Sequence, residues 1–118
     1  MRPVLVVSNN KINRSEKVVA LCITDAKGKM NHRDLPNQDS WYLLYAATSN
    51  EDKKFRPARP IYPGNMPYAF LETDSLVQCE EIKAVSKARF DFAKGCIGTL
   101  MPLDLSRIKV KFLRTYDF

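Results

Sequence analysis

Apolar residues gather first in two short runs, residues 3–7 and 18–23, which are rich in β-branched side chains. The polar segment between them, residues 9–17, lacks the spacing of apolar positions that marks a helix. The pattern therefore predicts two strands joined by a loop.

The register of this predicted hairpin decides which polar side chains meet. If Leu5 faces Leu21, then Arg2 lies directly across from Thr24. Directly opposed residues share one face of a sheet, with Cβ atoms about 5 Å apart. A guanidinium beside a hydroxyl would suit an anionic phosphodiester. The alternative is an ordinary arginine near a strand end.

The pattern changes over residues 25–67, where glycine, asparagine and proline recur and one apolar block, residues 41–47, stands alone. This composition predicts a long excursion that carries one short element. Strands are expected again at residues 76–79 and 82–85, separated by a polar break, and a short strand or turn at residues 95–98.

The C-terminal segment has helical spacing instead. Pro102 suits the first turn of a helix, Thr99 is a candidate cap upstream, and Asp104 falls in the first turn. The pattern predicts an amphipathic helix of about twelve to fifteen residues. Its apolar positions are Leu105, Ile108, Phe112 and Leu113.

Several short strands followed by one late helix predict a small, β-rich α+β domain, most simply a partly closed barrel with the helix packed on it. With 118 residues, a single domain over residues 1–118 is expected, in which residues 25–67 form an extended insertion. The three cysteines form no Cys-x-x-Cys pair, which favours reduced thiols and a cytoplasmic location. No window resembles a signal peptide or a membrane span.

The charge is uneven along the chain. The net charge is +6, and residues 1–66 hold eleven basic against six acidic side chains, whereas the remainder is nearly balanced. A positive first half favours polyanionic or acidic partners, although many soluble proteins carry such an excess as solvated surface.

Motifs of the common enzyme classes are absent. The sequence has no phosphate-binding glycine loop, nucleophile elbow or His-Glu-x-x-His spacing. The lone histidine, His32, cannot form a metal cage, and Cys22 and Cys79 are most simply small residues of the core. We therefore expect neither a metal nor a cofactor.

Three segments carry a family pattern. The first reads R-P-V-L-V-V-S-N over residues 2–9, and its partner strand ends in I-T at residues 23–24. The second reads D-S-L-V-Q-C-E-E-I-K over residues 74–83, and the third reads G-T-L-M-P-L-D-L over residues 98–105. Together and in this order they resemble the PemK/MazF family of toxin endoribonucleases.

The resemblance implies a small SH3-like barrel of the CcdB/PemK type with a C-terminal helix, usually in a homodimer. Such proteins cut single-stranded RNA, including mRNA, without a metal ion or the ribosome, and a cognate antitoxin silences them. Arg2 matches the family's catalytic arginine and Thr24 its catalytic serine or threonine. Glu80 occupies the position of an acidic residue implicated in some members, and Gln78 replaces a functional arginine of one branch.

The implied chemistry uses the ribose 2′-hydroxyl as the nucleophile. Arg2 would stabilise the charge that develops on the phosphate, and Thr24 would donate a hydrogen bond to it. Glu80 is the candidate for the general base. Candidate RNA-binding residues are Lys27, Lys29, Arg33 and Gln78. An acidic, partly disordered antitoxin segment is expected to cover the same basic surface.

Two departures from the family keep other functions open. The strand and flexible loop that usually precede the R-P pair are absent, and residues 25–67 are longer than is typical. A catalytically weak interaction module of the same fold is one alternative. A gyrase-binding toxin is another, although the Trp-Gly-Ile C-terminus that marks such relatives is replaced here by Tyr-Asp-Phe.

Overall fold

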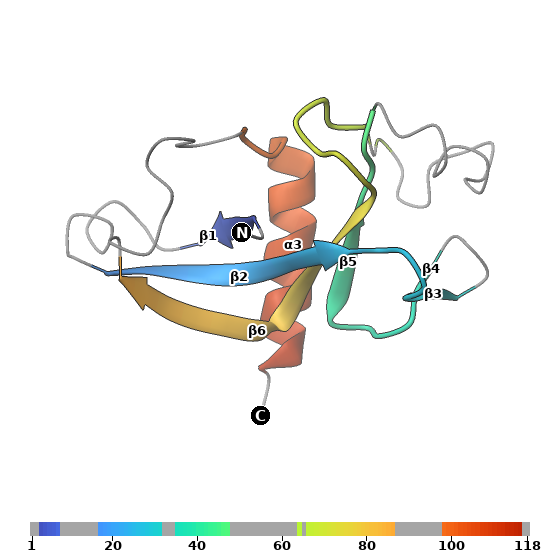
Figure 1. Ribbon diagram of the computed structural model, residues 1–118. Coiled ribbons are helices and arrows are strands. Elements are labelled where there is room, and N and C mark those ends of the chain that lie inside the picture. The colour runs from blue at the N-terminus through green and yellow to red at the C-terminus, as the bar shows by residue number, and fades with distance from the viewer. Residues whose placement is uncertain are drawn as a thin grey trace.

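A computed structural model shows an antiparallel sheet with the C-terminal helix packed against one face (Figure 1), which confirms the α+β class. The structure describes residues 3–7, 17–31, 35–47, 64, 66–86 and 98–116. The elements are β1 Val4–Val6, β2 Lys17–Asp25, β3 Met30–Asn31, β4 Leu35–Pro36, β5 Trp41–Leu44, β6 Ser75–Ser86 and α3 Pro102–Thr115.

The predicted N-terminal hairpin is confirmed. Strands β1 and β2 are antiparallel, with Leu5 opposite Leu21 and Val4 opposite Cys22, and the Val7 amide donates to the Val19 carbonyl at 2.9 Å. The four-stranded sheet has the order β1-β2-β6-β5. The predicted position of Arg2 follows from this register, but Arg2 itself lies outside the described residues.

The predicted break within residues 76–85 is wrong, because β6 is one strand. Its pairing with β2 shifts between Leu21, which faces Ile82, and Cys22, which faces Gln78. The additional residues of β6 are accommodated as a bulge, and the ladder resumes beyond them. Polar residues at this point therefore mark an irregularity within the strand and not its end.

The helix side of the sheet holds the larger apolar cluster. Ile23 of β2, Tyr42 of β5 and Val77 of β6 pack there with Ile108 of α3. The length and start of the predicted helix are confirmed, since α3 has 14 residues with Pro102 in its first turn.

Two details of the predicted helix are wrong. Leu105 is 40% exposed and Leu113 is 58% exposed, and the side chains that α3 buries are Asp104 and Ile108. The cap is Met101 without a side-chain hydrogen bond, in place of Thr99. Of the four apolar positions predicted from spacing, Ile108 is buried and Phe112 packs against the core, whereas Leu105 and Leu113 face outward.

A second cluster lies on the opposite face of the sheet. It joins Trp41 and Leu43 of β5 to Leu76 of β6, with Met30 of the small β3–β4 hairpin packed against it. The predicted short element at residues 41–47 therefore exists, and its strand belongs to the main sheet. Among the described residues, no helix combines the length and apolar character that crossing a membrane requires.

Candidate active site

Two polar side chains named from the sequence, Thr24 and Gln78, lie on the sheet face turned away from α3. Ile23 and Val77 are paired and face the helix, so their neighbours along each strand face the other way. Thr24 is opposite Leu76, and Gln78 is opposite both Cys22 and Trp41. Thr24, Gln78 and Trp41 therefore lie on one face.

Thr24 meets a lysine on this face. The Lys29 ammonium donates a hydrogen bond from Nζ to Thr24 Oγ1 at 2.8 Å. Thr24 is only 5% exposed, whereas Lys29 is half-buried. The hydroxyl thus lies beneath the ammonium, and a ligand that arrives from solvent meets Lys29 first.

A tight turn after β2 brings Lys29 back beside Thr24. The Lys29 amide donates to the Ala26 carbonyl at 3.0 Å, and Gly28 has a φ of 76°. A turn with positive φ at its third residue favours glycine there. The Asn37 amide in turn donates to the Lys29 carbonyl at 3.1 Å, so both backbone polar groups of Lys29 are held.

The start of this turn is hydrogen-bonded to Asp74, the residue before β6. The Ala26 amide donates to the Asp74 carbonyl at 2.9 Å, and Asp74 Oδ1 accepts from the Ala46 amide at 2.8 Å. The Lys27 amide donates to Asp25 Oδ1 at 2.9 Å. The turn that carries Lys29 is therefore tied to the sheet and to the segment that follows β5.

Glu80 occupies a separate place. The Trp41 indole donates from Nε1 to Glu80 Oε1 at 2.5 Å, while Glu80 Oε2 is buried and has no hydrogen-bond partner among the described residues. Glu80 lies four residues beyond Leu76, the partner of Thr24, which corresponds to a distance on the order of 10 Å along a strand. This geometry gives no support to Glu80 as the base for a phosphate bound at Thr24.

The structure thus brings some predicted residues together and separates others. Thr24 and Lys29 are in contact, Gln78 lies farther along the same face, and Lys27 is exposed on the adjoining turn. Arg2 and Arg33 lie outside the described residues. The contact of Trp41 with Glu80 was not predicted, because it joins residues 39 positions apart.

A buried carboxylate on the helix side has a different character. Asp104, 1% exposed, accepts from the Tyr42 hydroxyl at 2.6 Å and from the Tyr68 hydroxyl. Burial and these hydrogen bonds to Asp104 raise the pKa of Tyr68 to about 12 and also raise the pKa of Tyr42. The Tyr68 hydroxyl accepts from the Met101 amide at 2.9 Å. This network fastens the start of α3 to the sheet.

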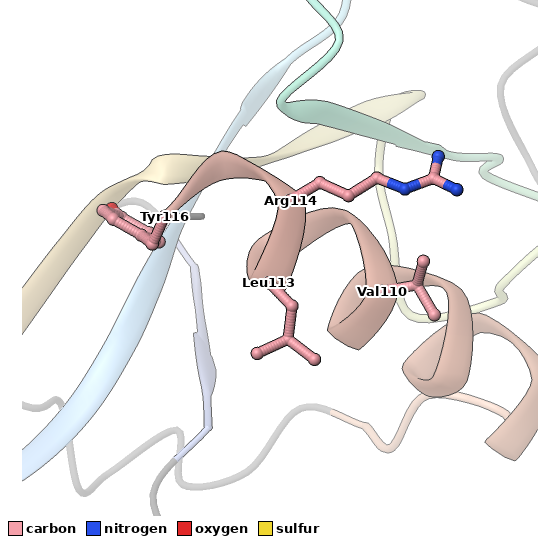
Figure 2. Close-up of a pocket in the computed structure, with 4 residues that line it drawn as sticks. All are labelled: Val110, Leu113, Arg114 and Tyr116. Atoms are coloured by element: carbon pink, nitrogen blue, oxygen red, sulfur yellow. The ribbon is translucent and has the colours of Figure 1, made fainter. Parts of the chain in front are cut away.

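Other described features do not extend the candidate site. A hollow of about 470 Å³ lies at the C-terminal end of α3, lined by Val110, Leu113, Arg114 and Tyr116 (Figure 2). Burial raises the pKa of the Cys79 thiol to about 11, which disfavours the reactive thiolate. Within the described ranges, no three His, Cys, Asp or Glu side chains are grouped so that they could hold a metal ion.

Solved structures share this fold. An endoribonuclease of a Mycobacterial species, solved in complex with its cognate antitoxin, has a TM-score of 0.59 and 19% identity over 96% of this chain and 78% of its own. The Mycobacterium tuberculosis toxin MazF-mt6 has a TM-score of 0.61 and 14% identity over 99% of this chain and 87% of its own. At these identities the likeness shows a common fold.

Sequence comparison supplies the family. A search among curated protein sequences finds no match. The family model of PemK-like, MazF-like toxins of type II toxin-antitoxin systems, however, matches residues 1–114. Since this match spans nearly the whole sequence, the chain belongs to the PemK-like, MazF-like toxins of type II toxin-antitoxin systems.

Proposed function

We propose that this toxin is an endoribonuclease that cuts single-stranded RNA without a metal ion, by attack of the ribose 2′-hydroxyl on the adjacent phosphate. The observation that carries the proposal is the contact between Lys29 and Thr24. It gives a hydroxyl from the family's catalytic position and a cation on one face of the sheet. Family membership and the endoribonuclease among the solved structures support it.

In this reaction the protein binds and neutralises the phosphate. Thr24 holds the Lys29 ammonium, and Arg2 is assigned to the oxygens of the phosphate on the strength of the family motif. Fixed cations stabilise the charge that accumulates on the phosphorus centre in the transition state. Gln78 and Lys27 are assigned to the neighbouring nucleotides, with Arg33 as a further phosphate contact.

Incubation with a long single-stranded RNA in EDTA tests the proposal. Cleavage should leave a 2′,3′-cyclic phosphate and a 5′-hydroxyl, and mapping of the ends identifies the sites. Arg2→Ala should abolish cleavage, while Arg114→Ala, at an exposed position near the end of α3, should leave it intact. An intact RNA, or cleavage that Arg2→Ala does not change, would leave a binding module as the better description.

We further infer that the toxin is a homodimer neutralised by an antitoxin with an acidic segment. Leu113 and Val110 are 58% and 51% exposed on the outer side of α3, which gives a second copy an apolar surface. The excess of basic residues in the first half of the sequence favours the acidic segment. The second copy of the toxin and the antitoxin are both part of the proposed function.

Two measurements test these partners. Sedimentation should give the mass of a dimer at micromolar concentration, and Leu113→Asp should shift it toward the monomer. Titration with RNA and an acidic antitoxin peptide together should show that the two exclude each other, with affinity for the peptide falling as salt rises. Simultaneous binding of RNA and peptide would reject a shared surface.

A further inference from the structure

Lys29 is the accessible member of the pair that it forms with Thr24. Its Nζ lies 2.8 Å from Thr24 Oγ1, Thr24 is buried, and Lys29 is half-buried. The turn at Gly28 and the two backbone hydrogen bonds of Lys29 fix where this side chain begins. An ammonium is therefore held at a defined point on the face that the proposed RNA would occupy.

The charge of this ammonium is available to an anion. In the described part of the chain its hydrogen-bond partner is the neutral hydroxyl of Thr24. The neighbouring carboxylate of Asp25 accepts from the Lys27 amide. An ammonium has three donors, and Thr24 occupies one of them. The remaining two can reach a phosphate oxygen and a bridging oxygen of the same group.

Cleavage by a 2′-hydroxyl also needs a proton donor for the leaving oxygen. An alkoxide that departs from phosphorus is strongly basic, so a positioned acid lowers the barrier. The guanidinium of an arginine is a poor donor, because it does not lose its proton in proteins. An ammonium can give up a proton and be recharged by solvent.

We propose that Lys29 is a catalytic residue of this toxin, whose ammonium contacts the scissile phosphate and gives a proton to the departing 5′ oxygen; the proposal rests on the RNA cleavage proposed above. The 2′ oxygen forms a bond to phosphorus and loses its proton to a solvent base. The bond from phosphorus to the 5′ oxygen breaks, and that oxygen takes a proton from Nζ. The products are a 2′,3′-cyclic phosphate and a 5′-hydroxyl, and the neutral amine regains its proton from water.

Under this mechanism Thr24 positions the Lys29 ammonium and also donates a hydrogen bond to the phosphate. Its Oγ1 accepts from Nζ, so its hydroxyl hydrogen is free of that contact and can point toward the phosphate. The turn that carries Lys29 follows the end of β2 directly.

A sulfur-substituted substrate separates proton donation from binding. The probe is an RNA oligonucleotide that contains the mapped cleavage site, made once with the natural 5′ oxygen and once with sulfur at that bridging position. A thiolate leaves without a proton, so cleavage of the sulfur substrate does not need an acid. Lys29→Met should slow cleavage of the oxygen substrate by about a hundredfold or more and that of the sulfur substrate by far less.

Two further variants complete the test. Lys29→Arg keeps the charge and should resemble Lys29→Met on the oxygen substrate, because it restores binding without an effective proton donor. Lys109→Met makes the same chemical change at an exposed position of α3, and this variant should cleave both substrates at the wild-type rate. Thermal unfolding of each variant shows whether it is folded.

The outcomes distinguish this proposal from the one on which it rests. Equal losses on the two substrates, or full activity of Lys29→Met, would overturn the role of Lys29 while RNA cleavage by the wild type stands. A wild type that cleaves neither substrate would overturn the RNA cleavage first, and the role of Lys29 with it.

Discussion

The two faces of the sheet hold carboxylates that are hydrogen-bonded in different ways. On the helix side, both oxygens of Asp104 accept hydrogen bonds from tyrosines. On the other face, Glu80 has one oxygen bonded to Trp41 and one that is buried with no partner in the described part of the chain, and the Lys29 ammonium donates to a neutral hydroxyl. Satisfied groups stabilise a fold, whereas incompletely satisfied ones retain capacity for a ligand. Substitution of Asp104 is therefore expected to change mainly stability, and substitution within the Lys29–Thr24 pair mainly activity.

The largest expected effect breaks the network on the helix side. Asp104→Ala leaves two tyrosine hydroxyls without their acceptor and should lower the free energy of unfolding by about 4 kcal/mol. Urea unfolding followed by circular dichroism measures the loss. Glu72→Ala, at an exposed carboxylate, is the matched control and should change stability by less than about 0.5 kcal/mol. Similar losses for both variants would contradict the distinction between the faces.

Substitution of Thr24 on the opposite face should change the rate of RNA cleavage more than the stability of the fold. Thr24→Val keeps the shape of the side chain but removes the acceptor for Lys29 Nζ, so cleavage of RNA should slow by about a hundredfold. The free energy of unfolding should change by about 1 kcal/mol or less. The control is Thr115→Val in α3, where the hydroxyl donates to the Lys111 carbonyl at 2.8 Å. It should leave the cleavage rate unchanged, and a loss there would place part of the activity on the helix side.

Alkaline pH should lower the free energy of unfolding through the tyrosines that are bonded to Asp104 on the helix side. The pKa of Tyr68 is about 12 in the folded protein against 10.0 for an ordinary tyrosine. Above pH 10 the unfolded chain loses the proton that the folded protein retains, so stability is complete below pH 10 and declines as the pH rises toward 12. Tyr68 alone should lower the free energy of unfolding by about 1 kcal/mol between pH 9 and pH 11, and Tyr42, whose pKa is also raised, adds to this loss; urea unfolding at both pH values measures it. Tyr68→Phe should reduce this pH dependence by the share that Tyr68 contributes, and an unchanged dependence would contradict the raised pKa of Tyr68.

The smallest expected effect concerns the Trp41 contact. Trp41→Phe removes the indole donor to Glu80 but keeps a ring in the cluster with Leu43 and Leu76. Stability should fall by about 1 kcal/mol. Cleavage should change by less than about threefold, since Glu80 lies along the strand from Thr24. A larger loss of cleavage at unchanged stability would return Glu80 to the reacting site.

The sequence predicted what local patterns determine. The β1–β2 register follows from two apolar runs, and α3 follows from Pro102 and helical spacing. Thr24 and Lys29 were both named, but their contact was not, because it depends on a turn at Gly28 that sends the chain back on itself. The burial of Asp104 was missed because a charged residue in a first helical turn ordinarily faces solvent. Its partners are 36 and 62 residues away, beyond the reach of any local pattern.

The distant partners of Asp104 also determine the stage of synthesis at which this toxin can complete its fold. Tyr42 and Tyr68 are synthesised well before Asp104, and Ile108 follows it. Until that last segment emerges from the ribosome, the inner face of the sheet has no helix to cover it, and two tyrosine hydroxyls lack their acceptor. Contacts of long sequence separation form late, because closing a long loop precedes the gain in energy. A nascent toxin of this kind would thus acquire its rigid scaffold only after all of its strands have left the ribosome.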